Sequence, residues 1–293
     1  MKIILYLMNE KGKLTLEKIC EYFSPQIIGA VISSRDHKVK NDYFNEIQDI
    51  CLNQKIIFYD RNENINIYID DDVFCLAVGW RWIIPRDHKL IVFHDSLLPR
   101  YRGFAPLVNA LINAEREIGV TALFASSEFD RGDIIAQKSL SVSYPITISQ
   151  AISAIAPLYQ ALAIEVVQAI IQSGSLIGMP QNESDATYSI WRDEDDYHID
   201  WNNDSDAIVR FINAVGYPYL GAFSWINDEK VYILEATVID DIALELRHVG
   251  KVIFHDGDTI IVIARQGLVK ITKMTDCNGN NLLPLSHFRV RLK

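Results

Sequence analysis

The first 95 residues alternate between short apolar runs and amphipathic stretches, and this alternation constrains the fold more than any other feature of the chain. The apolar runs lie at residues 2–8, 27–33, 55–59, 73–78 and 90–94. Between them, residues 14–23 and 42–53 carry apolar side chains at helical spacing. Continuous aliphatic runs are typical of parallel strands that are buried on both faces. Strand–helix repetition therefore predicts an α/β fold with a doubly wound, Rossmann-like sheet.

The sequence pattern changes after a segment without hydrophobic periodicity, from alternating helices and strands to mainly short β runs. Residues 106–114 and 147–173 are predicted helices, and residues 119–125 and 134–142 are predicted strands. We predict a first domain over 1–175, a linker over 176–189 and a second domain over 190–293. The second domain has one predicted helix at 205–215, followed by short β runs separated by turn residues. It is predicted to be a small, β-rich, barrel-like domain.

Two polar loops follow predicted strands. The run 90–93 ends in His94 and breaks into a loop that contains Pro99 and Gly103, and a second loop places Asp130 and Asp133 between two apolar runs. Ligands bind beyond the carboxyl ends of such strands. A histidine and a carboxylate on neighbouring loops are the minimum equipment for proton transfer near neutral pH.

Composition narrows the function classes. The net charge of −10 argues against a nucleic-acid binder that neutralises many phosphates. The four cysteines are scattered and show no metal-ligand spacing, so we expect reduced thiols, a cytoplasmic protein and no bound metal. No GxGxxG fingerprint follows the first apolar run, so a dinucleotide cofactor has no support. No uninterrupted apolar run reaches the roughly 20 residues that span a bilayer, so no membrane partner is expected.

The loop after His94 carries a family resemblance. Residues 93–103 read F-H-D-S-L-L-P-R-Y-R-G and resemble the H-x-S-L-L-P-x-Y-R-G signature of the 10-formyltetrahydrofolate-dependent formyltransferases, a family that includes methionyl-tRNA formyltransferase. Residues 119–121 (GVT) and 130–135 (DRGDII) are similar to two further motifs of that family. Residues 188–192, 199–201 and 212–223 resemble its C-terminal domain. The resemblance covers the chain from about residue 73, and the earlier part matches in pattern only.

The resemblance implies transfer of a formyl group from 10-formyltetrahydrofolate to a primary amine. An uncharged amine attacks the formyl carbon, an oxyanion develops, and the amine loses a proton. By the resemblance, His94 donates to the oxyanion or shuttles the proton, and Asp130 holds His94 in its charged form and binds the folate through a water. Asp133 is also expected near the folate, although it is equally explained as a structural turn residue.

One position departs from the family pattern. The family has asparagine two residues before the histidine, where it is taken as an oxyanion donor, and this chain has Val92. Valine has no hydrogen-bond donor. Three interpretations stay open: another group donates instead, the enzyme works with a weaker oxyanion site, or the protein has changed its donor or lost its activity.

The remaining site candidates come from position within the matched motifs. The segment that matches the pterin-binding loop, together with one loop residue, is expected to bind the folate: Trp80, Arg81, Trp82, Ile83, Ile84 and Leu98. Substrate-binding candidates are Ser96, Arg100, Tyr101, Arg102, Tyr217 and Tyr219, because guanidinium groups suit phosphates and aromatic rings suit bases. For each of these groups a purely structural role is the alternative: tryptophans in the core, Arg102 as a brace of the loop, and the tyrosines as a seal at the domain junction.

The acceptor is predicted from the domain build. Two domains with these C-terminal motifs resemble the sugar N-formyltransferases, so we expect a nucleotide-linked amino sugar, used for surface polysaccharides, as the substrate. Methionyl-tRNA is the alternative acceptor, disfavoured by the acidic charge. A non-catalytic module that binds folate or a nucleotide sugar is a third reading, and Val92 favours it. A homodimer fits a small β domain, but the sequence does not demonstrate one.

Overall fold

The computed structural model describes residues 2–36, 39, 41–63, 72–85, 89–287 and 289–293, which pack into two compact units. The first unit consists of Met1–Pro106, Glu117–Ser141 and Ile152–Ile190, and the second of Leu107–Arg116, Val142–Ala151 and Trp191–Lys293. Two short pieces of chain before residue 175 thus pack with the second unit, which residue order alone does not reveal.

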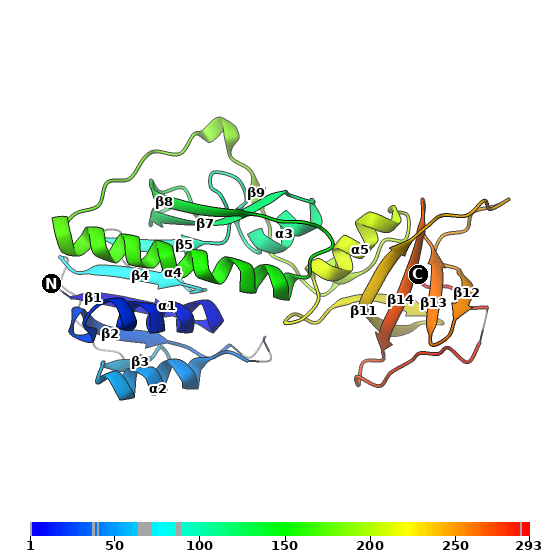
Figure 1. Cartoon of the computed structure of the whole chain (residues 1–293), viewed down its shortest axis with the longest axis horizontal. Helices are drawn as coiled ribbons and strands as arrows, with labels where there is room; N and C mark the ends of the chain where they lie inside the picture. The colour runs from blue at the N-terminus through cyan, green and yellow to red at the C-terminus, as the bar shows by residue number, and fades with distance from the viewer. Residues whose placement is uncertain (1, 37–38, 40, 64–71, 86–88, 288) are drawn as a thin grey trace. The chain divides into compact units, whose positions relative to one another are not determined.

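A seven-stranded sheet forms the core of the first unit (Figure 1). In spatial order its strands are β3 (Phe58–Asp60), β2 (Ile28–Ser33), β1 (Ile3–Leu7), β4 (Phe74–Val78), β5 (Leu90–His94), β7 (Glu117–Phe124) and β8 (Ile134–Ser141). The first five strands are parallel, and β7 and β8 continue the sheet in antiparallel fashion. The predicted α/β class is confirmed. The antiparallel edge is an addition that apolar runs cannot reveal.

In the described part of the chain, four helices lie between or after the strands of this sheet. They are α1 (Asn9–Tyr22), α2 (Phe44–Gln54), α3 (Pro106–Ile112) and α4 (Ile148–Ser173), and most of α3 packs with the second unit. Helix α1 begins at Asn9, before the predicted start at residue 14, because Asn9 takes a left-handed conformation (φ 60°) that leads directly from β1 into the helix. Gly12 allows the close approach, since a Cβ there would lie 3.1 Å from the carbonyl carbon of Leu7.

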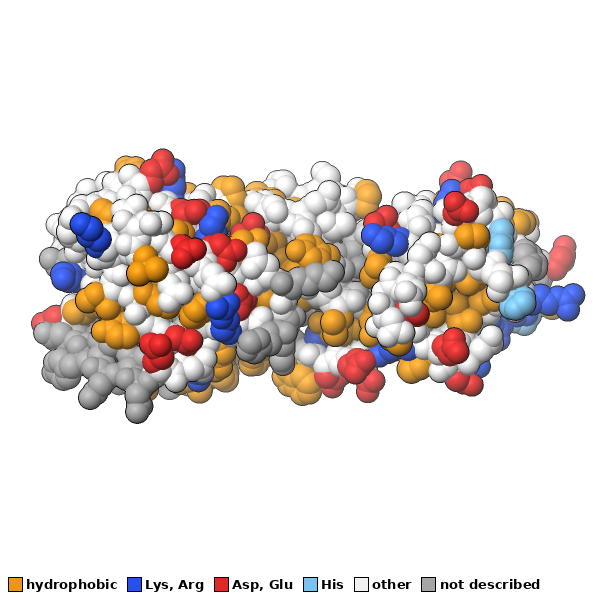
Figure 2. Space-filling model, turned by 90° about the horizontal axis from the view of Figure 1, so that it is seen from below, with side chains coloured by type: hydrophobic (Ala, Val, Ile, Leu, Met, Phe, Trp, Pro, Cys, Tyr) orange, Lys and Arg blue, Asp and Glu red, His pale blue; other side chains and the backbone are white. Residues whose placement is uncertain are grey.

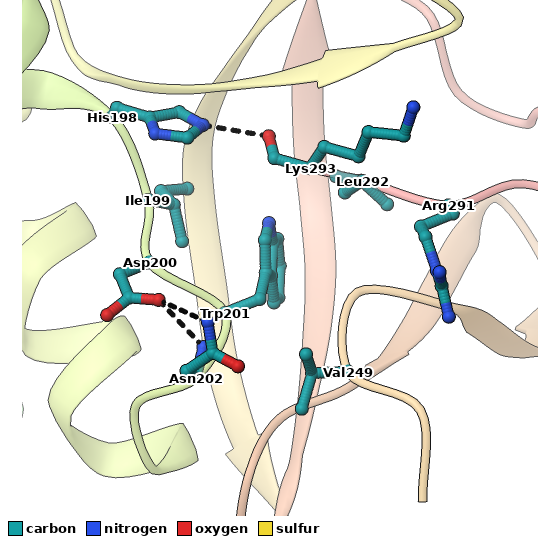
Figure 3. Close-up of a pocket in the computed structure, with 9 residues that line it drawn as sticks. All are labelled: His198, Ile199, Asp200, Trp201, Asn202, Val249, Arg291, Leu292 and Lys293. Carbon is teal, nitrogen blue, oxygen red and sulfur yellow. Dashed lines mark hydrogen bonds between the residues drawn. The ribbon is translucent and has the colours of Figure 1, made fainter.

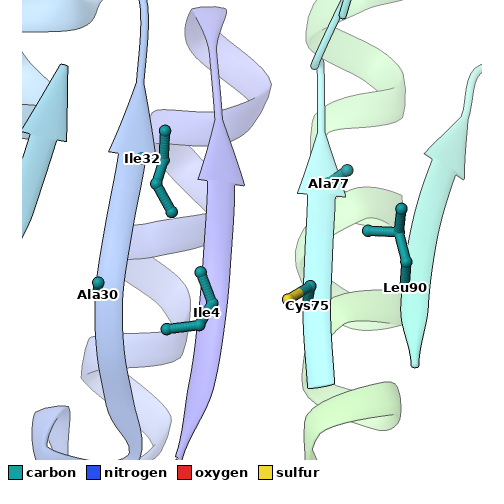
Figure 4. Close-up of a cluster of buried hydrophobic side chains, with 6 residues drawn as sticks. All are labelled: Ile4, Ala30, Ile32, Cys75, Ala77 and Leu90. Atoms are coloured by element: carbon teal, nitrogen blue, oxygen red, sulfur yellow. The ribbon is translucent and has the colours of Figure 1, made fainter. Parts of the chain in front are cut away.

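The two faces of the sheet are buried differently. Figure 4 shows six side chains that pack on one face: Ile4, Ala30, Ile32, Cys75, Ala77 and Leu90. Helices α1 and α4 lie on the opposite face (Figures 1 and 4). Helix α4 turns a stripe inward in which each side chain is less than 2% exposed: Ile155, Tyr159, Leu162, Val166 and Ile170. By length and composition α4 is apolar enough to cross a membrane, with a mean hydropathy of 1.6, but this stripe is buried in the protein.

The strand order positions the site. Successive strands move outward from β1 to β2 and β3, and the chain then returns to the other side of β1 with β4 and β5. Ligand sites of open α/β sheets form beyond the carboxyl ends of strands near such a reversal. His94 is the last residue of β5 at this edge.

The second unit contains a five-stranded antiparallel sheet. Its strands, in spatial order, are β10 (Ala222–Ile226), β11 (Glu229–Ile239), β14 (Leu268–Thr275), β13 (Thr259–Ile263) and β12 (Val252–Asp256). Helix α5 (Ser205–Ala214) packs on β11 and β14 through the buried side chains of Ile208 and Ile212. The β-rich character predicted for this region is confirmed.

Candidate active site

His94 is held at the end of β5 in one orientation. Its side chain is 9% exposed, and its Nε2 lies 2.8 Å from the carbonyl oxygen of Tyr101. A carbonyl oxygen only accepts hydrogen bonds, so Nε2 carries a proton and donates it to Tyr101. The other ring nitrogen, Nδ1, is therefore the position at which His94 gains or loses a proton.

Asp130 faces that nitrogen. Its Oδ1 lies 3.6 Å from His94 Nδ1, within ion-pair range but longer than a direct hydrogen bond. Its Oδ2 accepts a 2.8 Å hydrogen bond from the backbone N–H of Gly103. The structure thus brings together the histidine and the carboxylate that the sequence predicted on separate loops. We call His94 and Asp130 the dyad.

The loop between His94 and Gly103 is secured by hydrogen bonds to β7 and β8. Thr121 Oγ1 donates to the Ser96 carbonyl (2.6 Å) and accepts from the Leu98 N–H (3.2 Å), and Gln137 Nε2 donates to the Leu98 carbonyl (2.8 Å). Ser96 Oγ donates to the carbonyl of Arg100. Ser96 and Leu98 are both 4% exposed, so the structure supports a role for these two candidates in holding the loop.

Arg102 is fully buried at the centre of a second network. It begins β6 (Arg102–Gly103), which pairs with β9 (Tyr188–Ser189). Its guanidinium donates to both Glu183 carboxylate oxygens (3.0 and 2.9 Å) and to the Tyr188 hydroxyl (3.2 Å). The hydrogen bonds between Arg102 and Glu183 raise the pKa of Arg102 above its ordinary value and lower the pKa of Glu183. These contacts favour the second of the two predicted roles of Arg102, a brace of the loop, over substrate binding, because its donors are engaged inside the protein.

Gln181 connects this network to the dyad. Its Oε1 accepts from Arg102 Nε and Nη2 (3.1 and 2.8 Å), and its Nε2 donates to the carbonyls of Asp130 and Gly132 (2.7 Å each). Sequence reasoning missed Gln181 and Glu183, because both fall in the aperiodic segment 176–189. No local pattern in that segment distinguishes these two residues from their neighbours.

A substitution at Gly103 tests the close packing of β6 against β9. Its φ is 98°, and a Cβ at this position would lie 2.5 Å from the Ser189 carbonyl oxygen. We expect Gly103→Ala to lower the free energy of unfolding by more than the roughly 1–2 kcal/mol of the backbone conformation alone. Gly174→Ala is the matched control, since Gly174 has φ 67° but no atom within 4 Å of the new Cβ. Denaturant unfolding that shows equal losses in both variants would contradict the predicted clash.

The predicted folate loop packs an aromatic group near the end of β4. Trp80 makes edge contacts with Tyr6 (5.1 Å between ring centroids) and Trp82 (5.2 Å), and Arg61 lies over the Trp82 ring. The Trp80 indole N–H is buried and has no acceptor among the described residues. Buried donors without an acceptor are rare in folded proteins, so this indole N–H is a candidate for hydrogen bonding to a ligand.

The other candidates of this loop divide between surface and core. Arg81 pairs with the buried Asp36 at 2.9 Å. Ile83 is 83% exposed, whereas Ile84 packs against the apolar cluster of the sheet. Folate binding by these residues stays a prediction.

The remaining substrate candidates lie in different surroundings. Arg100 is exposed and its guanidinium lies over the Tyr101 ring at 5.2 Å, while that ring is itself buried. Asp133, a folate candidate, is exposed in the loop that carries Asp130, and its folate contact stays a prediction. Tyr217 and Tyr219 belong to the second unit, with Tyr217 57% exposed. Their predicted role in substrate binding stays a prediction.

A hollow of about 350 Å³ lies in the second unit (Figure 3). His198 Nε2 donates to the Lys293 carbonyl (2.8 Å), Asp200 accepts from Asn202, and the nearly buried Trp201 donates to Ser224 (3.0 Å). These polar groups are satisfied within the unit and form no acid–base pair. Across the described part of the chain, no group of three or more His, Cys, Asp or Glu side chains is arranged to hold a metal ion.

Comparison with known proteins by sequence points to one family. Residues 70–167 match the formyl transferase model, and residues 192–288 match the formyl transferase C-terminal domain. A methionyl-tRNA formyltransferase of Syntrophomonas wolfei is 31% identical over 219 residues, which cover 73% of this chain and 68% of the relative. The matched part thus spans about two thirds of that relative's length.

Comparison by structure gives the same fold over nearly the whole chain. The sugar 3N-formyltransferase WlaRD, solved with dTDP and 5-N-formyl-THF, is 20% identical with a TM-score of 0.67, covering 95% of this chain and 98% of that chain. The N-formyltransferase from Helicobacter canadensis, solved with folinic acid and dTDP-3-aminofucose, is 19% identical with a TM-score of 0.68, covering 94% and 100%.

Proposed function

The chain belongs to the formyl transferase family, and from this we propose that it transfers a formyl group from 10-formyltetrahydrofolate to the primary amine of a nucleotide-linked amino sugar. The observation that carries the proposal is the dyad, in which a histidine with one fixed nitrogen presents the other to a carboxylate. This arrangement suits a reaction in which one proton moves between an amine and a leaving nitrogen.

The dyad's geometry supports a role for each of its polar atoms. Because Nε2 is engaged by Tyr101, His94 acts through Nδ1. With a proton on Nδ1, His94 donates to the oxyanion of the tetrahedral intermediate, and the Asp130 carboxylate favours that charged form. Gly103 keeps Asp130 in place through its N–H.

The reaction balances with these two groups. The acceptor nitrogen attacks the formyl carbon and a new C–N bond forms. The bond from that carbon to N10 of the folate then breaks, and the proton lost by the amine passes through the dyad to N10. The products are a formamide and tetrahydrofolate, and the dyad returns to its starting protonation state.

The surroundings of Trp80 fit the donor. A pterin ring carries a carbonyl and ring nitrogens that accept hydrogen bonds, and the Trp80 indole N–H is a buried donor without an acceptor. Val92 packs against the same apolar cluster as Trp80. At this position the chain thus offers apolar contact in place of the family's amide donor, and the oxyanion depends on His94.

Charge supports a small acceptor over a tRNA. The chain carries a net charge of −10, and Figure 2 shows Lys and Arg side chains scattered among Asp and Glu on one face. A protein that binds the phosphates of a tRNA needs a continuous basic surface. The sugar N-formyltransferases named above also match this chain over 98–100% of their own length.

Methionyl-tRNA is the second candidate acceptor. It is favoured by the 31% identity to the methionyl-tRNA formyltransferase of S. wolfei.

An acceptor panel separates these candidates. The protein is mixed with 10-formyltetrahydrofolate and, in separate reactions, with nucleotide-linked amino sugars or methionyl-tRNA. Release of tetrahydrofolate is followed by absorbance and the acceptor by mass. We expect release, with a formylated product, from at least one amino sugar. Formylation of methionyl-tRNA alone overturns the acceptor, formate release without any amine indicates hydrolysis, and tight folate binding without release indicates a non-catalytic module.

A further inference from the structure

A half-buried ion pair adjoins the dyad. Asp95 follows His94, and its carboxylate forms an ion pair with Lys11 of α1 and accepts a hydrogen bond from the Tyr159 hydroxyl of α4. The Tyr159 side chain is 1% exposed, its ring stacks on Phe93 at 6.1 Å, and the Lys11 ammonium lies 5.4 Å from the ring centroid. We call Lys11, Asp95 and Tyr159 the triad.

The alternation of β5 explains why the triad and the dyad lie on opposite faces. Successive side chains of a strand point to opposite faces of its sheet. Leu90 and Val92 belong to the face with the apolar cluster, which His94 shares by register, whereas Phe93 and Asp95 face α4. The end of β5 is therefore held on both faces of the sheet. The loops that follow His94 and carry Asp130 contact one face, and helices α1 and α4 contact the other.

The triad keeps Asp95 charged. Burial alone would raise the pKa of the Asp95 carboxyl, but the charge of Lys11 and the hydrogen bonds from Lys11 and Tyr159 outweigh it, so the pKa lies below its usual value. Burial, followed by the charge of Asp95, raises the pKa of Tyr159 well above its usual value, so the hydroxyl keeps the proton that it donates. Two opposite full charges therefore persist beside His94.

These charges act on His94. Asp95 is the next residue after His94, so the charges of its carboxylate and of its Lys11 partner lie close enough to act on the imidazole, and a negative charge favours a protonated imidazole. Lys11 opposes that effect. The other groups that face His94 are Asp130 at Nδ1 and the Tyr101 carbonyl at Nε2. On the loop side, Glu183 pairs with both Arg102 and Arg131, and Glu128 pairs with Arg131, so two positive and two negative charges balance there.

We propose that Asp95 and Lys11 are positioning residues that fix the end of β5 and balance the charge next to His94. They thereby set the proton affinity of His94 to the value that the reaction requires. Tyr159 contributes a hydrogen bond but no charge. The inference rests on the proposed formyl transfer for its purpose. Its physical content, the control of proton affinity at His94, can be measured without any substrate.

The opposite charges of Lys11 and Asp95 predict opposite effects for two substitutions. Lys11→Met leaves the Asp95 charge uncompensated, so His94 keeps its proton to a higher pH. Asp95→Asn leaves the Lys11 charge uncompensated, so His94 loses its proton at a lower pH. We expect shifts of roughly half a pH unit or more in each direction. The double variant Lys11→Met/Asp95→Asn restores neutrality and returns close to the wild-type titration, and Tyr159→Phe, the matched control, keeps both charges and leaves the titration in place.

The measurement is an NMR titration of the histidine rings in the full chain, with the His94 signal assigned by its loss in His94→Gln. The pH dependence of kcat/KM with the best acceptor is measured alongside and should move with the titration. Equal titration of His94 in Lys11→Met and Asp95→Asn, or a shift in the same direction, overturns the inference even if the variants are less stable. Opposite shifts without any formyl transfer would preserve the inference and overturn the proposed function.

Discussion

Replacing His94 with glutamine is expected to lower kcat for formyl transfer by about a thousandfold, in the middle of the range for loss of a general acid–base group. Glutamine can still donate a hydrogen bond, but it cannot carry a proton between the amine and the folate nitrogen. Because the Nε2 hydrogen bond to Tyr101 is one of many that hold this loop, the variant should remain folded. Steady-state kinetics measures the loss, and thermal unfolding checks the fold.

Asp130→Asn provides the matched comparison. It keeps the shape of the side chain and an oxygen for the Gly103 N–H, and it removes the charge that faces His94. We expect a loss of at least about a hundredfold in kcat with little change in KM. If either variant retains a kcat within a few-fold of the wild-type enzyme, the role assigned to that residue is wrong.

Replacing Arg102 with methionine is expected to lower the free energy of unfolding by roughly 3 kcal/mol. That value is at the low end of the cost of breaking a buried ion pair, because the Glu183 carboxylate that remains is 54% exposed and solvated. Methionine keeps most of the apolar stem but leaves Gln181 Oε1 without its donor. Since Gln181 also holds the Asp130 loop, kcat should fall as well.

Arg131→Met is the control for that experiment. Arg131 pairs with the same Glu183 carboxylate at 2.9 Å, but its side chain is 35% exposed. An exposed ion pair contributes little to stability, so this variant should unfold at nearly the wild-type denaturant concentration. If chemical denaturation ranks the two variants equally, burial of Arg102 is not the source of its stabilising effect.

The sequence predicted the elements whose pattern is local. The parallel strands are continuous aliphatic runs, so β1, β2, β4 and β5 were located within a residue or two. The start of α1 was missed because it depends on the backbone conformation of Asn9 and on the small size of Gly12, which no periodicity reports. The pairing of β6 with β9 was missed because each strand has only two residues.

Site residues that belong to local motifs were predicted, and those that depend on long-range contacts were not. His94 and Asp130 were predicted because each lies in a loop that directly follows or separates apolar runs within a recognisable motif. Arg102 was left between two roles, since a sequence does not say whether a guanidinium meets a ligand or a glutamate of its own chain. Lys11 and Tyr159 were not foreseen, because they reach Asp95 across 84 and 64 residues and from different helices.

The dyad loops are braced by Gln181, Glu183 and Thr187, whose Oγ1 accepts a 2.9 Å hydrogen bond from the Tyr101 N–H, and this has a consequence for biosynthesis. These contacts join parts of the chain that lie 51 to 86 residues apart, and a ribosome releases all seven strands of the first sheet before it adds the later partners. The growing chain can therefore form the sheet, with His94 already held by Tyr101, before the Asp130 loop and Arg102 acquire their later partners. The positioning of Asp130 would then be completed as a separate, later event, when Gln181 becomes available to bond its carbonyl.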